Sequence, residues 1–346
     1  MISDYHPDMA GKENLSRHFY LNAKSHQLAF FPRHYFRGLV NQADHLIAIL
    51  SEADMHTLEG VDPKSIMIRG QALKKYREWR DKKEDEGKFS WTLALYGTAA
   101  MAKEAGLSEK EYWNQIIRSC FLDKPSPIAD WRKTYQKIDR YLQKLDRLAI
   151  EKVKIEGADV NLSILIGDKR RWRAGGGANI PSFEIFTSPD WRGTEGWIRF
   201  NQPLYHYGHL VQGIELEFKN GLVVKSRAKK NERLLKEMIA VKNADKVGEF
   251  SLTDKRFSRI DKFMAETLFD ENFGGSYGNT HIALGDSYHE CFDGKQKGVA
   301  KPAWLKMGFN DSSVHTDIIS TTNRTVTAYL KSGRKKVIYK NGIFTL

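Results

Sequence analysis

Cysteine is scarce in this sequence, which has only Cys120 and Cys291 among its 346 residues. Two cysteines cannot build the disulfide framework of a small secreted domain, so a reducing compartment is expected. Long apolar runs are also missing: the longest, Leu46–Leu50, falls far short of the ~20 residues that a membrane-spanning helix needs. The N-terminus has no basic stretch followed by an apolar segment, so no signal peptide is predicted. We therefore expect a cytoplasmic protein without a membrane partner.

Acidic residues are outnumbered, because 55 lysines and arginines against 43 aspartates and glutamates give a net charge of +12. Such a balance is typical of proteins that bind nucleic acid or another anion. The basic residues, however, are scattered or form short runs such as Lys169–Arg173 and Arg334–Lys336, without the aromatic spacing of a base-stacking platform. A solvated surface is the better interpretation, and nucleic acid is not the expected partner.

Two common site motifs are missing. Gly175–Gly177 is not followed by Gly-Lys-Ser/Thr, so a phosphate-binding loop is not indicated. No helix carries His-Glu-x-x-His, the motif of many single-zinc proteases. A function must therefore be sought in residues that are farther apart in the sequence.

A chain of this length is too long for one small core, so two domains are expected. In the first half, predicted strands alternate with helices, as in an α/β domain. Asp62-Pro63 predicts a helix start, and Ser108–Glu111 forms a capping box. Residues 1–25 are polar and aperiodic, which predicts a flexible arm. The expected elements are strands at 44–50 and 90–96 and helices at 62–83, 108–120 and 127–148.

The sequence changes character near residue 150. Strands are expected at 151–155 and 160–166, and Asn220-Gly221 and Asn341-Gly342 supply the positive φ values of tight hairpin turns. Helices are expected at 229–241 and 259–265. The predicted fold is an α/β domain over residues 1–150 followed by a mostly β, α+β domain over residues 151–346.

A sparse set of acids and histidines lies in the second half, each inside or beside an apolar segment. A carboxylate there is costly to desolvate unless something offsets its charge. Carboxylate oxygen and imidazole nitrogen are ligands that zinc, cobalt and manganese accept. A shared site for one or two metal ions is the simplest single explanation. The candidate ligands are Glu184, Glu249, Glu271, His281, His315 and Asp317.

His315 and Asp317 lie in a predicted strand, where a period of two places both side chains on one face. His281 lies in another short strand, and Glu271 precedes it across a glycine-rich stretch that can fold back tightly. Taken singly, each residue is better explained as an exposed side chain at the end of an element. Only the joint pattern favours a metal site.

Eight segments of the chain occur in a characteristic order. They are Ser90–Tyr96, Ala129–Arg132, Asn179–Thr187, Glu195–Phe200, Gly248–Phe250, Thr267–Asn272, His281–Gly285 and His315–Asp317. In that order they resemble the thermophilic-type metalloaminopeptidase family, which includes aminopeptidase T, aminopeptidase S and PepS-like enzymes. The resemblance extends from about residue 40 to the C-terminus.

The resemblance implies a cytoplasmic hydrolase that uses two divalent ions (zinc, cobalt or manganese) to release amino acids from peptides with a free N-terminus. It also implies a homodimer with the metal site in an enclosed cavity of the C-terminal domain. The family's ligands carry over to the six candidates above, and Tyr288 matches a tyrosine near the metals. Compared with the family, the first domain is expected to be shortened at its N-terminus.

For the reaction we expect a water that is activated between two ions. Glu271 is the expected bridging ligand, Glu249 the candidate proton acceptor and Tyr288 the candidate donor to the oxyanion. Glu195 is the candidate anchor for the substrate amine. Three alternatives stay open: another dinuclear hydrolase, such as a phosphoesterase or amidohydrolase; a basic nucleic-acid-binding protein without catalysis; and a family member that has lost activity.

Overall fold

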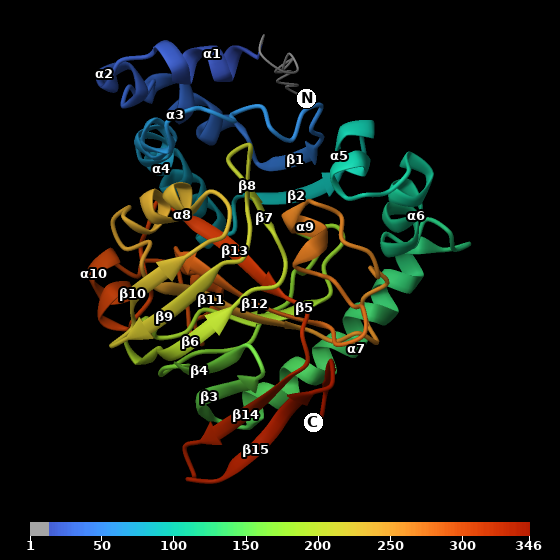
Figure 1. The fold of residues 1–346 in the computed structure, drawn as a ribbon. Coiled ribbons are helices and arrows are strands. Elements are labelled where there is room, and N and C mark those ends of the chain that lie inside the picture. Colours follow the sequence, from blue (N-terminus) through green and yellow to red (C-terminus); the bar gives the residue numbers. More distant parts are fainter. Residues whose placement is uncertain (1–13) are drawn as a thin grey trace.

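The computed structural model describes residues 14–346 as a mixed α/β protein with several sheets (Figure 1). The α-helices are α1 (Leu15–Asn22), α2 (Ser25–Leu28), α3 (Arg33–Gln42), α4 (Pro63–Asp85), α5 (Ala99–Glu104), α6 (Glu109–Ser119), α7 (Pro127–Arg147), α8 (Glu232–Ile239), α9 (Thr267–Asp270) and α10 (Lys301–Lys306). The strands are β1 (His45–Leu50), β2 (Ser90–Leu95), β3 (Ile150–Gly157), β4 (Val160–Leu165), β5 (Glu184–Thr187), β6 (Glu195–Arg199), β7 (Leu204–His206), β8 (His209–Val211), β9 (Glu215–Lys219), β10 (Leu222–Arg227), β11 (Val247–Thr253), β12 (Asn279–Gly285), β13 (His315–Ser320), β14 (Arg324–Leu330), β15 (Lys335–Lys340) and β16 (Ile343–Phe344).

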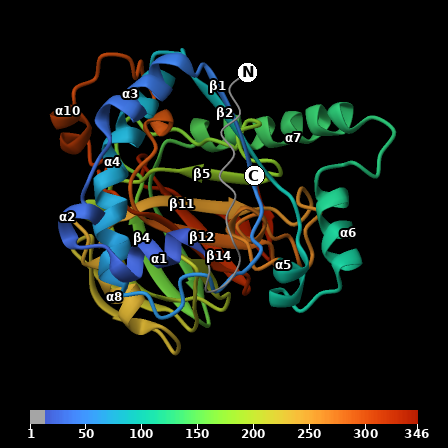
Figure 2. The ribbon, with the colours of Figure 1, turned by 90° about the horizontal axis from the view of Figure 1, so that it is seen from above.

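Two antiparallel sheets make up most of the second half of the chain. The larger has eight strands in the order β10-β9-β6-β4-β3-β14-β15-β16, and the smaller has four in the order β13-β12-β11-β5. A parallel pair, β1-β2, comes from the first half, and β7-β8 is a short hairpin. Seen from above, α3 and α4 lie on one side of the molecule and α6 on the other (Figure 2).

Local sequence signals explain several of the element boundaries. The Asp62 carboxylate accepts a hydrogen bond from the backbone N–H of Lys64 at 3.1 Å, and Pro63 occupies the first turn of α4. Ser108 and Glu111 form the reciprocal capping box that opens α6. Asn220 and Asn341 both have positive φ values at the tips of the β9-β10 and β15-β16 hairpins. These four predictions are confirmed.

Two predicted elements differ from the structure. The expected helix at 259–265 is wrong: α9 begins only at Thr267, and Ala265 just before it has a φ of +54°, which a continuous helix cannot contain. The expected arm at 1–25 lies partly outside the described residues. Its described part contains α1, whose N-terminus is capped by the Asn14 side chain, so this segment is not aperiodic.

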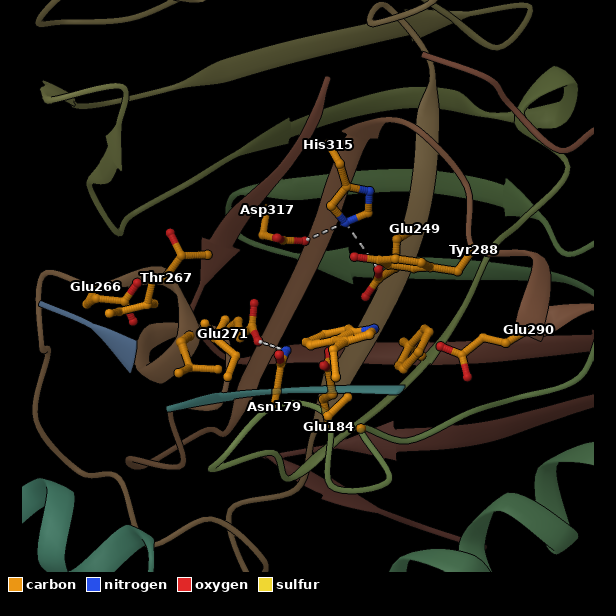
Figure 3. Close-up of a pocket in the computed structure, with 17 residues that line it drawn as sticks. Asn179, Glu184, Glu249, Glu266, Thr267, Glu271, Tyr288, Glu290, His315 and Asp317 are labelled. Atoms are coloured by element: carbon orange, nitrogen blue, oxygen red, sulfur yellow. Dashed lines mark hydrogen bonds and ion pairs between the residues drawn. The ribbon is translucent and has the colours of Figure 1, made fainter. Parts of the chain in front are cut away.

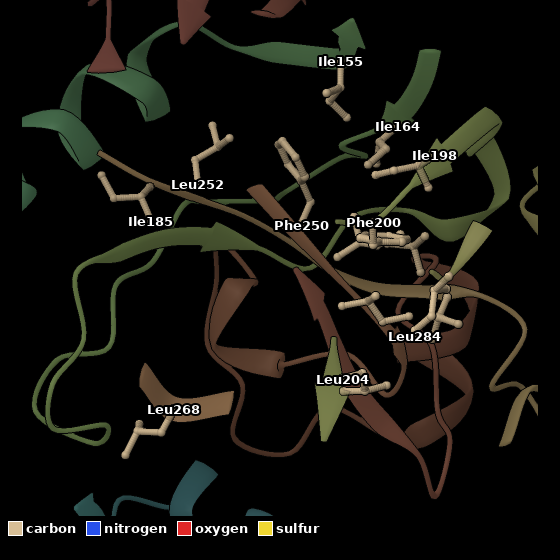
Figure 4. Close-up of a cluster of buried hydrophobic side chains, with 14 of the residues drawn as sticks. Ile155, Ile164, Ile185, Ile198, Phe200, Leu204, Phe250, Leu252, Leu268 and Leu284 are labelled. Atoms are coloured by element: carbon tan, nitrogen blue, oxygen red, sulfur yellow. The ribbon is translucent and has the colours of Figure 1, made fainter. Parts of the chain in front are cut away.

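The four-stranded sheet has two different faces. One face carries Ile185, Phe250, Leu252 and Leu284, which are buried in a large apolar cluster that also contains Ile155, Ile164 and Ile198 of the eight-stranded sheet (Figure 4). Burial of the apolar surface of both sheets stabilises this arrangement. β11 and β12 are buried on their other face as well, so burial does not alternate along these two strands although polar residues occupy that second face.

The β1-β2 pair is connected to the second half through its inner strand. The backbone N–H of Leu93 donates to the carbonyl of Ala178 at 2.7 Å, and the N–H of Ile180 donates to the carbonyl of Leu93 at 2.9 Å. Asn179 is thereby held opposite Leu93 in a parallel bridge. This connection fixes the segment that leads into β5.

The predicted division into two domains at residue 150 stays a prediction. The largest buried apolar cluster includes residues from both sides of that point, among them Tyr112, Ile138 and Phe250. None of the helices between residues 14 and 346 is long and apolar enough to span a membrane.

Candidate active site

The second face of the four-stranded sheet carries acids and histidines from all four strands. In the pairing register, Thr253 of β11 is opposite Glu184 of β5, and Ser251 of β11 is opposite His281 of β12. Ala283 of β12 is opposite both Glu249 of β11 and Asp317 of β13, and Gly285 of β12 is opposite His315. Since directly paired residues share a face, the register brings these five side chains together.

A β-bulge contributes to this arrangement. The register of β11 with β12 shifts between Val247 and Glu249, so that Val247 turns to the apolar face while Glu249 stays on the other. Gly248 forms the bulge, and an added Cβ there would lie 2.0 Å from the carbonyl oxygen of Asp286. Only glycine fits this close approach of two backbones.

The first group of potential metal ligands contains Glu184, Glu249 and His281, all buried. The Nε2 atom of His281 lies 3.3 Å from Oε2 of Glu184 and 3.4 Å from Oε1 of Glu249. Ser251 donates a hydrogen bond to Oε2 of Glu184 at 2.8 Å, which fixes that carboxylate.

The second group contains Glu249, His315 and Asp317. The Nε2 atom of His315 lies 3.5 Å from Oε2 of Glu249 and 3.6 Å from Oδ1 of Asp317. Glu249 thus belongs to both groups, with one carboxylate oxygen facing each histidine. Figure 3 shows its contact with His315. Oδ1 of Asp317 is buried without a hydrogen-bond partner, as is expected of an atom that serves a cation.

Both histidines are oriented through their outer ring nitrogens. Nδ1 of His315 lies 2.9 Å from the carbonyl oxygen of Asp286, and Nδ1 of His281 lies 3.3 Å from the side-chain oxygen of Asn279. Both partners are acceptors, so Nδ1 carries a proton and Nε2 is the ring atom that faces the carboxylates and could ligate a cation in the neutral imidazole. This outer hydrogen bond is usual for histidines that ligate metals.

The electrostatics of the cluster call for a compensating positive charge. Burial lowers the pKa of His281, but the hydrogen bonds to Glu184 and Glu249 outweigh it and raise this pKa to about 10. Burial would raise the pKa of Asp317, but His315 and His281 outweigh it and hold this pKa at about 2. Divalent cations can supply the same compensation while leaving the histidines neutral, and the residues present therefore fit such ions.

The cluster forms one wall of a pocket of about 270 Å³. Glu271, at the C-terminal end of α9, lines the pocket outside both groups, and the Asn179 amide donates to its Oε1 at 3.2 Å. Burial, followed by the charge of Glu184, raises the pKa of Glu271 well above its usual value. Leu50 and Leu93 of the β1-β2 pair also line the pocket, so the first half of the chain takes part in enclosing it.

Tyr288 lines the same pocket, and its ring lies against that of His315, with 4.7 Å between the ring centroids. Although Tyr288 is 41% exposed overall, partial burial of the phenol and the charge of Glu249 both raise the pKa of its hydroxyl. The hydroxyl is therefore a proton-bearing hydrogen-bond donor beside the cluster.

Glu195 is not near the cluster. It lies at the start of β6 in the eight-stranded sheet, is exposed, and accepts a hydrogen bond from the backbone N–H of Asn220. It is absent from the pocket lining, and the anchoring role expected of it stays a prediction that this position does not support.

Several pocket residues were not among the sequence predictions. Asn179 lies five positions before Glu184 in a segment already singled out, and Trp91 follows Ser90 in another. Glu266 and Glu290 carried no signal of their own, because acids at the ends of helices are common. Only the tertiary structure brings these four side chains to the pocket.

The sequence model of the thermophilic metalloprotease family (M29) matches residues 5–344, and the chain belongs to this family. Among curated relatives, aminopeptidase AmpS from Bacillus subtilis is 26% identical over 325 residues, which cover 87% of this chain and 76% of the relative. Aminopeptidase T from Thermus thermophilus is 28% identical, and the match covers 85% of this chain and 74% of the relative.

The structure is similar to that of wild-type AmpT from Thermus thermophilus, with a TM-score of 0.77 and 25% sequence identity. The alignment covers 96% of this chain and 85% of the other. The predicted family and the prediction of a hydrolytic metalloenzyme are confirmed, and a basic nucleic-acid-binding protein is no longer a competing interpretation.

Proposed function

We propose that the protein is a metal-dependent aminopeptidase that releases N-terminal amino acids from peptides. The observation that carries this proposal is the single carboxylate of Glu249, which joins two ligand groups, each with its own histidine. Two ligand groups that share one carboxylate are typical of dinuclear hydrolases, in which the ions are about 3.5–4 Å apart. Family membership and the names of the relatives support the same conclusion.

Two divalent ions are proposed, with Glu184 and His281 serving one and His315 and Asp317 serving the other. Glu249 is the proposed bridging ligand, because each of its oxygens faces a different group. This assignment replaces Glu271, which the sequence had favoured for the bridge. The oxygen and nitrogen donor set suits zinc, cobalt or manganese.

When bound, the ions would supply an activated water and polarise the scissile carbonyl. Because both oxygens of Glu249 face ligand groups, the proton-accepting role expected of it passes to Glu271, which lies in the pocket outside the groups and would be ionised once bound cations offset the neighbouring carboxylates. Asn179 holds this carboxylate in place through the 3.2 Å hydrogen bond. Tyr288 is the proposed hydrogen-bond donor to the oxyanion, because its hydroxyl keeps its proton.

The substrate amine is a cation and needs acidic surroundings. Glu266 lines the pocket on the same side as Glu271, and one of its carboxylate oxygens is buried without a hydrogen-bond partner (Figure 3). We assign to Glu266 the anchoring role that was expected of Glu195. Specificity for a free N-terminus follows, because an internal peptide segment has no charge to place there.

Homodimerisation and a cytoplasmic location belong to the same proposal. Both cysteines are free, in keeping with a reducing compartment. Sedimentation equilibrium of the purified protein tests the dimer, and a single species at the monomer mass of 39.8 kDa would contradict it.

The function is tested with an amino-acid p-nitroanilide and a free peptide, each with added cobalt, zinc or manganese and with excess chelator. We expect metal-dependent release of the N-terminal residue and no cleavage of N-acetylated peptide. His315→Ala should remove this activity while the far-UV circular dichroism spectrum stays unchanged. Hydrolysis of phosphate esters without release of amino acids would instead support a different dinuclear hydrolase.

A further inference from the structure

A second, larger cavity of about 740 Å³ adjoins the site pocket. One wall is α4, which contributes side chains from Lys74 to Glu86, and the other is the segment from Asp286 to Asp311. Its volume falls within the ~300–1,000 Å³ of typical ligand-binding pockets, whereas the site pocket falls just below that range. The metalloprotease reaction as derived so far leaves this cavity without a role.

The two cavities share part of their lining. Trp91, Tyr288 and Glu290 contribute to both, so they surround the junction between them. The Nε1–H of Trp91 donates to Oε1 of Glu84 at 3.1 Å, which connects the junction to the end of α4. Glu290 is held by Arg173, with 3.4 Å between the charged atoms.

The positions of the residues across the pocket indicate the orientation in which a peptide substrate would bind. In Figure 3, Glu266 and Glu271 lie on one side of the ligand groups, and Tyr288 and Glu290 lie on the other. If the amine lies towards the unpartnered carboxylate oxygen of Glu266, the chain beyond the scissile bond points towards Tyr288 and Glu290. That is the side on which the second cavity opens.

We propose that this second cavity binds the peptide chain that follows the scissile bond, so that several residues of the substrate contribute to its recognition. The inference rests on the proposed aminopeptidase function and adds a binding site for the leaving part of the peptide. The smaller pocket has no room for several further residues, because the ligand groups and the side chains that face the substrate amine already take up its lining.

Contacts between polar and charged side chains connect the two walls of the cavity. Lys301 pairs with Glu78 at 3.1 Å and with Asp311 at 2.8 Å, which connects α4 to the α10 segment. At the other end, Nδ1 of His289 lies 3.5 Å from Asp85 of α4. A binding site whose shape is set in advance loses less conformational freedom when a peptide enters.

Both apolar and polar groups are available to the peptide. Leu305 of α10 lines the cavity and is 44% exposed, whereas its neighbour Trp304 is buried in the aromatic cluster beneath. Arg80 of α4 also lines the cavity, and its Nε is buried without a hydrogen-bond partner. The charge of Arg80 acts on Asp81 and Glu84, while its unpartnered Nε–H is available to a peptide carbonyl.

The test compares a hexapeptide with an amino-acid p-nitroanilide, whose leaving group ends near the junction. Leu305→Trp narrows the second cavity without touching the ligand groups. We expect kcat/KM for the hexapeptide to fall at least tenfold, chiefly through KM, while kcat/KM for the anilide stays within twofold. Ile128→Trp is the matched control, because Ile128 is an exposed apolar residue at the start of α7, outside both cavities.

A second variant, Arg80→Met, keeps the unbranched apolar stem of the side chain and removes its donors. It should raise KM for the hexapeptide several-fold and leave KM for the anilide unchanged. Equal effects on both substrates, or no effect on the hexapeptide in either variant, would overturn the proposal. Inactivity of the metal-loaded wild-type protein towards both substrates would instead refute the proposed function itself.

Discussion

Glu249 differs from the other acids of the site in that its two oxygens face different histidines. Glu184 and Asp317 each belong to one group only. Substitutions at these positions should therefore differ in the number of ions lost per chain as well as in the rate of catalysis that remains.

We predict that Glu249→Gln lowers the metal content by both ions per chain and reduces kcat/KM by more than about 100-fold, since even outer partners of metal ligands contribute 10–100-fold. Glu184→Gln should lose chiefly one ion. Elemental analysis after gel filtration measures both. Retention of two ions by Glu249→Gln would show that this carboxylate is not shared.

A second prediction concerns Asp81 of α4. Burial raises its pKa from 3.8 to about 6, although Arg80 partly opposes this. The folded protein therefore binds this proton more tightly than the unfolded chain does. The resulting contribution to the free energy of unfolding is fully present below pH 4 and is lost as the pH rises through 6. Asp81→Asn should therefore be more stable than wild type at pH 8, by about 1–3 kcal/mol.

Urea unfolding at pH 8 and at pH 4 tests this prediction for Asp81, and the difference should vanish at the lower pH. Glu151→Gln, an exposed change on β3, is the control and should show no such dependence. A constant difference at both pH values would mean that the carboxyl is not desolvated.

Among the elements, β11 carries the most specific requirement of the site. Its bulge at Gly248 turns Glu249 towards the cluster while Val247 enters the core. The added methyl group of Gly248→Ala would meet the backbone oxygens of both Asp286 and Gly285.

We expect Gly248→Ala to destabilise the protein by about 1–3 kcal/mol, as overpacking does, and to reduce activity further by displacing Glu249. Gly70→Ala is the matched control, because this glycine in α4 has open space around it. The control should be stabilised by about 0.5–1 kcal/mol with unchanged activity. Melting curves together with anilide assays separate the two effects.

The sequence predicted those elements whose signals are local. The capping box at Ser108, the proline at 63 and the Asn-Gly hairpin tips each depend on a few adjacent residues, and all are present in the structure. The helix expected at 259–265 failed because its apolar residues are buried by the tertiary fold without helical geometry. Asn179 and Glu266 could not be predicted for the site, since their positions depend on β2 and on the turn before α9.

At the scale of the whole molecule, the buried acids connect metal binding to folding. Glu184 and Glu249 are only 5% and 3% exposed, so their charges have to be offset inside the folded protein. Ions that bind only the folded state stabilise it by an amount that grows with the logarithm of their concentration once this exceeds the dissociation constant.

Chelation should therefore lower the melting temperature, and metal at 100 times its dissociation constant should restore about 2.7 kcal/mol per ion. Differential scanning calorimetry with and without chelator measures the effect. Glu249→Gln should respond little to either treatment, because it no longer retains the ions. An equal response in both proteins would place the stabilising metal elsewhere.

The strand register places the candidate ligands of β5, β11, β12 and β13 on one face of the sheet. This arrangement has a practical consequence for protein preparations. Side chains alternate strictly along a strand, so a slip of β13 by a single residue would send both His315 and Asp317 into the apolar layer. Misfolded molecules of this kind would be wholly inert rather than partly active. The specific activity of a sample would then be proportional to its fraction of correctly paired molecules, which is the quantity that an active-site titration measures.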